Sequence, residues 1–68
     1  MELTAVIYLD DQTTLLVAEC PELGVASQGQ TEDEALENLK EATELYLESF
    51  PNAHVKTAKV SRFALAHA

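Results

Sequence analysis

The sequence predicts a single small α+β domain with the element order β-β-β-α-β, an antiparallel sheet and one helix packed on one face of that sheet. Three observations predict it. Apolar residues recur with period two near the N-terminus, residues 20–35 hold both glycines and the first of two prolines, and the apolar spacing then becomes helical. A chain of 68 residues makes one domain with a thin core. We expect it to span residues 1–65, with 66–68 fraying.

The first two strands are expected to form a hairpin. Residues 3–9 alternate, the acidic turn Asp10-Asp11-Gln12 interrupts them, and the apolar run from Thr13 to Glu19 follows. A three-residue loop pairs Leu9 with Thr13 and gives one apolar face of Leu3, Ala5, Ile7, Leu9, Leu15 and Val17. The opposite face then carries Val6, Tyr8, Leu16 and Ala18. A loop longer by one residue exchanges the partners but still leaves two apolar faces. One face should therefore meet the helix and the other should meet another molecule.

The stretch after this hairpin holds the turn chemistry. Pro21 ends the second strand because it cannot donate to a ladder, and Gly24 permits a left-handed turn. Val25 to Gln28 is expected to form a short third strand, which Gly29 ends. Two changes of direction are thus fitted around one short strand.

A helix is expected from Glu32 to about Ser49. Thr31 is its N-cap, with Glu34 completing a capping box, and Pro51 stops it. The apolar face is expected to comprise Ala35, Leu36, Leu39, Ala42, Tyr46 and Phe50, with Leu47 at its edge.

The opposite helix face carries an acidic stripe of Glu34, Glu37, Glu41, Glu44 and Glu48, with only Lys40 nearby. Such a stripe is either an ordinary solvated face or a docking surface for a basic partner. Leu45 lies apart from the apolar face, so it is either a scattered surface residue or an interface residue.

Beyond Asn52 the charge changes sign, because Lys56, Lys59 and Arg62 are three of the four basic residues. The run from Val60 to Leu65 is expected to form a fourth strand, with Ser61, Phe63 and Leu65 on one face. A second short helix is the alternative, but valine, phenylalanine and an open sheet edge favour the strand.

Composition limits the partners. A formal charge of -8 repels phosphates, so we expect no direct nucleic-acid binding by this chain alone. A single cysteine, Cys20, forms no internal disulfide, and a thin core then favours a homodimer. No apolar run approaches a membrane span and no leader pattern opens the chain, so we expect a cytoplasmic protein without membrane contact.

Residues capable of catalysis are sparse. His54 and His67 have no ligand set around them, so we expect no metal site. Glu19 and Glu22 flank Cys20 and disfavour its thiolate, so we interpret it as structural. The serines show no nucleophile elbow and the glycines no phosphate loop. We expect no catalytic residues, no cofactor and no enzymatic activity.

Residues 17–48, VAECPELGVASQGQTEDEALENLKEATELYLE, resemble the HicB-like antitoxin family. The resemblance lies in the Pro21-to-Gly24 turn, the step from Gly29 to Thr31, and the helical pairs Glu34-Ala35, Glu41-Ala42 and Tyr46-Leu47. It implies a partial ribonuclease H-like fold. It also implies an antitoxin of a type II toxin-antitoxin pair, which binds a HicA-like toxin, a small basic RNA-cleaving protein, and occludes its RNA-binding surface.

Longer family members carry a C-terminal DNA-binding domain, and only three residues follow Leu65 here, so we expect no such domain in residues 1–68. The residues expected to contact a partner are Val6, Tyr8, Leu16, Glu37, Glu41, Glu44, Leu45 and Glu48. An orphan dimeric binding module without a toxin and a magnesium-dependent nuclease are the alternatives. Dimerisation edge to edge and dimerisation through Val6, Tyr8 and Leu16 both stay open.

Overall fold

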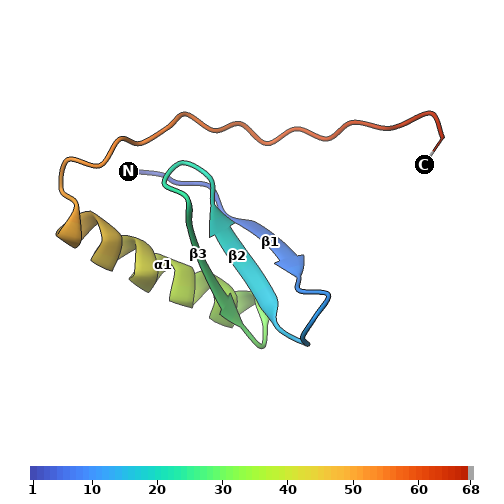
Figure 1. Cartoon of the computed structure of the whole chain (residues 1–68), viewed down its shortest axis with the longest axis horizontal. Coiled ribbons are helices and arrows are strands. Elements are labelled where there is room, and N and C mark those ends of the chain that lie inside the picture. The colour runs from blue at the N-terminus through green and yellow to red at the C-terminus, as the bar shows by residue number, and fades with distance from the viewer. Residues whose placement is uncertain (68) are drawn as a thin grey trace.

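The computed structural model describes residues 1–67 and contains three strands and one helix. The strands are β1 (Val6–Leu9), β2 (Leu16–Cys20) and β3 (Val25–Gly29), and the helix is α1 (Glu32–Ser49). The strands form an antiparallel sheet in the order β1-β2-β3. Helix α1 lies across one face of this sheet (Figure 1). The predicted α+β class and the order β-β-β-α are therefore confirmed.

The predicted fourth strand is wrong. Residues 53–65 form neither strand nor helix, and the chain beyond α1 runs as one long extended segment (Figure 1). Among residues 54–67, the one backbone hydrogen bond to the rest of the fold runs from the Lys56 N–H to the Glu22 carbonyl, at 3.0 Å. Alternating valine and phenylalanine favour an extended backbone, but a strand also needs a hydrogen-bonded neighbour. Of the residues expected to fray, Ala68 lies outside the described part of the chain.

The predicted hairpin register is also wrong. Leu9 pairs with Leu16 and Ile7 pairs with Ala18, so the loop between the strands is three residues longer than expected. A register shift by an odd number of residues moves the side chains of one strand to the opposite face of the sheet relative to its partner. Leu16, Ala18 and Cys20 consequently share the helix-facing side with Ile7, whereas the expected core positions Leu15 and Val17 do not.

The core is small and lies between β2, β3 and α1. Its buried apolar residues are Ala18, Cys20, Ala35 and Leu39. Leu3, Ile7, Leu16, Leu23 and Val25 pack around them as partly buried residues. Thr43 on the helix is buried as well. The predicted core residue Phe50 is exposed, and its ring lies tilted against that of Tyr46 with centroids 5.1 Å apart.

The predicted turn and cap residues are placed as expected. Gly24 has φ 71°, the left-handed conformation that glycine adopts without steric cost. The Glu34 N–H donates to Thr31 Oγ1 at 3.1 Å, so Thr31 is the N-cap. The Glu34 carboxylate accepts from the Gln30 N–H at 3.0 Å, one residue before the N-cap. The helix therefore begins and ends within the predicted bounds.

Within residues 1–67 no helix has both the length and the apolar character that crossing a bilayer requires.

Candidate protein interface

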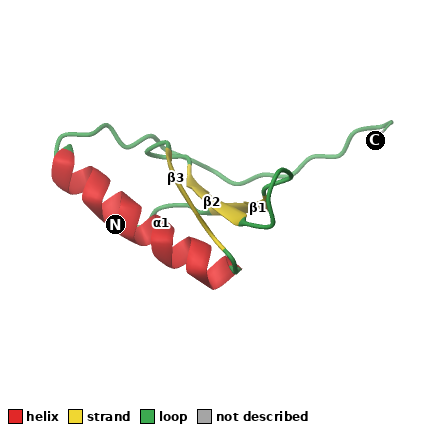
Figure 2. Cartoon of the chain, turned by 60° about the horizontal axis from the view of Figure 1, so that its bottom comes forward, coloured by secondary structure: helices red, strands yellow, loops and turns green. Residues whose placement is uncertain are grey.

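The sheet face opposite α1 is partly apolar and open. Val6 and Tyr8 are 43% and 46% exposed, and both project from this face of β1. The C-terminal segment passes the sheet on this side (Figure 2), and its residues Ala58 to Arg62 border a hollow with Thr4 and Val6. The open face is thus a surface where valine, tyrosine and a neighbouring acid, Glu19, lie together.

Tyr8 and Glu19 interact across this face. The Tyr8 hydroxyl donates to Glu19 Oε1 at 3.1 Å. This hydrogen bond, followed by desolvation and the negative charge of Glu19, raises the pKa of Tyr8 above its ordinary value of 10.0. The pair orients the ring of Tyr8 and presents a polar and an apolar group side by side, a combination common at protein interfaces.

Leu16 does not belong to the open face, so its predicted partner contact is wrong. It packs against the buried core from the helix-facing side of β2. The corrected register explains the error, because Leu16 lies opposite Leu9 and not beside Tyr8.

The acidic stripe of α1 points away from the sheet, and all of its residues are exposed: Glu34, Glu37, Glu41, Glu44 and Glu48. Lys40 lies 3.5 Å from Glu37 Oε1 and forms the only ion pair within residues 1–67. The other carboxylates of the stripe have no basic partner there, so this rigid helix face carries uncompensated negative charge. Leu45 is 57% exposed beside it.

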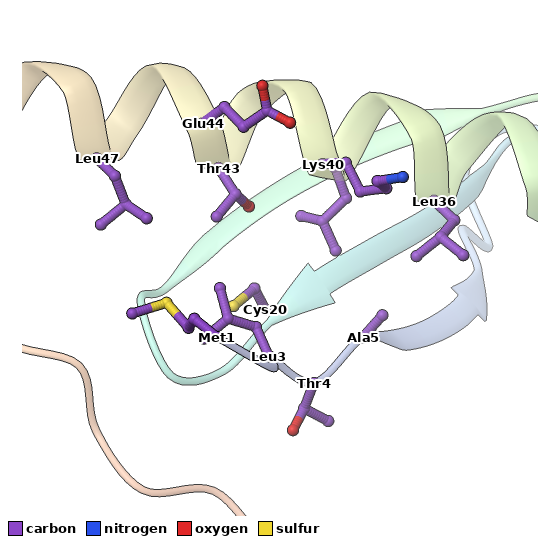
Figure 3. A pocket seen from close by; sticks show the side chains of 11 residues that line it. Met1, Leu3, Thr4, Ala5, Cys20, Leu36, Lys40, Thr43, Glu44 and Leu47 are labelled. Atoms are coloured by element: carbon purple, nitrogen blue, oxygen red, sulfur yellow. The ribbon is translucent and has the colours of Figure 1, made fainter.

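A shallow apolar groove of about 320 Å³ lies between α1 and the N-terminal segment. Figure 3 shows Leu36 and Leu47 on the helix, Leu3 and Ala5 on the segment, and Cys20 between them. Glu44 and Lys40 stand at its rim, so the acidic stripe borders an apolar depression. The sequence did not predict this groove, because whether Leu36 is buried or exposed depends on where the helix crosses the sheet.

The groove's N-terminal wall is held by a buried carboxylate. Glu22 is 6% exposed, and its Oε2 accepts from the Thr4 N–H at 2.8 Å and from the Thr4 hydroxyl at 2.6 Å. The hydrogen bond from the Thr4 hydroxyl is the main cause that lowers the pKa of Glu22 below its ordinary value of 4.5, and the bond from the Thr4 N–H adds to it. Desolvation opposes this shift but does not cancel it. Glu22 thereby fixes the segment that leads into β1.

Cys20 is buried against Glu22. Its Sγ lies 3.5 Å from Glu22 Oε1, and burial is the main cause that raises the pKa of the thiol above 9.0. A protonated, enclosed thiol is a poor nucleophile. Across residues 1–67 no group of three or more histidine, cysteine or acidic side chains is arranged to hold a metal ion.

No protein-family model, curated protein or solved structure matches this chain. The HicB-like family therefore stays a prediction that rests on the residues quoted above.

Proposed function

We propose that this chain is a HicB-like antitoxin, a non-catalytic protein that binds a small basic RNA-cleaving toxin of the HicA-like type and occludes its RNA-binding surface. The observation that carries the proposal is the uncompensated acidic stripe on α1. A surface that binds RNA phosphates is basic, and a rigid row of carboxylates competes for the same charges. The encounter takes place in the cytoplasm.

The stripe has apolar neighbours that suit a protein partner better than free nucleic acid. Leu45 is exposed beside it, and the apolar groove opens at Glu44. Stable protein interfaces combine a desolvated apolar centre with a charged rim. The toxin would therefore lie along α1, with its basic side chains on Glu37, Glu41 and Glu48 and an apolar residue near Leu45.

The test begins with any small basic reading frame that lies beside the gene of this chain, expressed alone and together with this chain. The proposal expects growth arrest by the neighbour alone, rescue by co-expression, and recovery of a complex. If the neighbour is harmless or does not bind, the antitoxin function is wrong and a binding module without a toxin replaces it.

The role of the stripe is tested separately with the purified complex. Glu37→Gln, Glu41→Gln and Glu44→Gln combined should raise the Kd about tenfold or more and flatten its dependence on salt. Glu2→Gln, Asp11→Asn and Glu32→Gln combined remove the same charge elsewhere and form the matched control. Equal effects of the two triple variants would show that net charge, and not the stripe, drives binding.

A further inference from the structure

The two edges of the sheet differ in their protection. At the outer edge of β3, the Asn38 side-chain amide of α1 donates to the Gln28 carbonyl at 2.8 Å. A helix side chain thus occupies an acceptor that another strand would need. Covering an edge in this way discourages strand addition.

Within residues 1–67, the outer edge of β1 has no such cover. The Asp10 N–H donates to the Leu15 carbonyl at 3.0 Å, and this fixes which residues of β1 bond to β2. Hydrogen-bonded and non-hydrogen-bonded residue pairs alternate along an antiparallel ladder. The backbone groups of Val6 and Tyr8 therefore bond to β2, and the backbone N–H and C=O groups of Ile7 and Leu9 point to the outer edge. The four residues of β1, VIYL, include no charge and no proline, and its pairing contains no bulge. These are the usual devices that block an edge.

The C-terminal segment has the complementary properties. Residues 57–67 make no hydrogen bond within the part of the chain that the structure describes. Phe63 is 87% exposed, and Val60 and Leu65 are exposed as well. Residues 51–68 contain three basic and no acidic side chains, whereas residues 1–50 contain all twelve acids and one lysine.

We propose that residues 57–65 of a second copy add to the outer edge of β1 as a fourth strand, and that the exchange is reciprocal within a two-fold dimer. Reciprocal exchange of an identical element is a common route to dimers. Pairing β1 with β1 of another copy would bring two strongly acidic bodies together, whereas the basic segment is attracted to the acidic body. The proposal gives the expected homodimer a geometry and does not depend on a toxin.

The side chains on each face of the added strand suit the side chains on the same face of the sheet at β1. Phe63 and Leu65 fall on one face, where they would lie beside Ile7 and Leu9 on the helix side of the sheet. Leu9 is 64% exposed there, and Leu36 is 38% exposed on the helix that covers this side of the sheet. Arg62 falls on the other face, where Glu19 and Tyr8 already lie together. Apolar residues meet apolar ones, and a base meets an acid.

A molecule's own segment is poorly placed for this edge. Its start is tied to the β2–β3 turn by the bond between Lys56 and Glu22, and it then passes Thr4 and Val6 over the open face. Figure 2 shows the segment on the side of the sheet opposite α1, continuing beyond the sheet toward the C-terminus. A segment that projects from one molecule in this way is free to reach another.

Crosslinking between two distinguishable copies tests the pairing. One copy carries Tyr8→Cys, and a second, larger tagged copy carries Ala64→Cys. The native Cys20 is buried and contributes little background. A short bismaleimide should join the two copies, with a yield about tenfold above that of the control Gln28→Cys on β3. Equal yields from β1 and β3 would overturn the proposal. A single chain carrying both cysteines that crosslinks only within itself would also overturn it, since its own segment then fills the edge.

Sedimentation of the full chain gives a second readout. The chain should sediment as a dimer, and Phe63→Ser should raise the dimer dissociation constant about tenfold. Leu45→Ser, which removes another exposed apolar group, this one from α1, is the control and should leave the constant unchanged. Both sites are exposed, so circular dichroism should show native structure in each variant. A wild-type chain that stays monomeric at all concentrations contradicts the proposal.

Discussion

Thr4 and Glu22 are 18 residues apart in sequence, yet Thr4 donates both its backbone N–H and its hydroxyl to one oxygen of the Glu22 carboxylate, at 2.8 and 2.6 Å. The backbone carbonyl of the same glutamate accepts a hydrogen bond from the Lys56 N–H. One residue in the β2–β3 turn therefore positions both the segment that enters β1 and the segment that leaves α1. A charged acceptor with little exposure makes these bonds strong.

The Thr4–Glu22 pair should make stability depend on pH. Because the pKa of Glu22 is lower in the folded chain than its ordinary 4.5, the ionised carboxylate stabilises the fold. That contribution is present above the ordinary value and is lost as the pH falls through the lower, folded value. Glu22→Gln should reduce the free energy of unfolding at neutral pH, and the gap to the wild type should shrink in acid. Urea unfolding of both proteins at neutral and at acidic pH measures this difference in the free energy of unfolding.

The control for this prediction is Glu2→Gln, which removes an exposed carboxylate that forms no hydrogen bond within residues 1–67. It should change the free energy of unfolding at neutral pH less than Glu22→Gln does. A gap between wild type and Glu22→Gln that is independent of pH would contradict the assignment.

Gly29→Ala should destabilise the fold by about 1–3 kcal/mol, since the added Cβ overpacks a close contact. A Cβ at this position would lie 2.5 Å from the Ala35 nitrogen and 2.8 Å from the Glu34 carbonyl carbon, both backbone atoms that cannot move aside. Gly24→Asn is the matched control, because its Cβ meets open space and asparagine tolerates the φ of 71°. Thermal unfolding compares the stability of the two variants, and we expect the lower Tm for Gly29→Ala. Equal Tm values would disprove the packing argument.

Thr31→Ala should cost about 1 kcal/mol of stability because the Glu34 N–H loses its capping oxygen. Thr31→Ser should retain most of the wild-type stability, since serine also accepts this bond. Thr14→Ala, in the exposed loop between β1 and β2, controls for the loss of a threonine. Urea unfolding measures all three, and a serine variant as unstable as the alanine variant would rule out the cap as the cause.

The Tyr8 hydroxyl should titrate above 10.0 and should titrate at lower pH once Glu19 is changed to glutamine. The hydrogen bond to the carboxylate stabilises the protonated phenol, and the negative charge opposes formation of the phenolate. Tyrosinate absorbance reports this directly in a Tyr46→Phe background, where Tyr8 is the sole tyrosine. An identical titration with and without Glu19 would show that the pair does not form in solution.

Cys20 should react with a thiol reagent about a hundredfold more slowly in the folded chain than in denaturant. Its thiol is buried, and burial raises its pKa, so both access and ionisation limit the reaction. The exposed thiol of Gln28→Cys, measured in the same protein, should react at a rate close to that of a free thiol. Rapid modification of Cys20 in the folded wild type would contradict its place in the core.

Much of the fold follows from local sequence chemistry. Thr31 and Pro51 delimit the helix because capping and the restricted backbone of proline act over a few residues. Gly24 marks its turn for the same reason. The acidic stripe could also be placed, because a helix of known bounds fixes which residues share a face.

The hairpin register could not be predicted, because the loop is stabilised by hydrogen bonds that period counting does not detect. Asp10 accepts from the Gln12 N–H and from the Thr13 hydroxyl, and Thr13 Oγ1 accepts from the Leu15 N–H. These side-chain bonds stabilise a six-residue loop where three residues were expected. Leu16 was misplaced on the open face for this reason alone.

The fourth strand and the groove depend on tertiary arrangement. A strand is defined by its neighbour, and the alternation of Val60 to Leu65 contains no information about whether one is present. The groove arises because α1 crosses β3 and β2 and leaves Leu36 beside the N-terminal segment. Sequence spacing determines the apolar face of a helix but not its crossing position on a sheet.

The hydrogen bond from Asn38 to Gln28 also limits how far this protein can polymerise. A sheet with two bare edges can recruit molecules at both sides and grow into a fibre. Here a helix side chain occupies an acceptor on one side, and in the proposed dimer the other side is filled after a single pairing. The proposed dimer would in this way keep a small, thinly packed domain with an uncharged edge strand from becoming the seed of an aggregate.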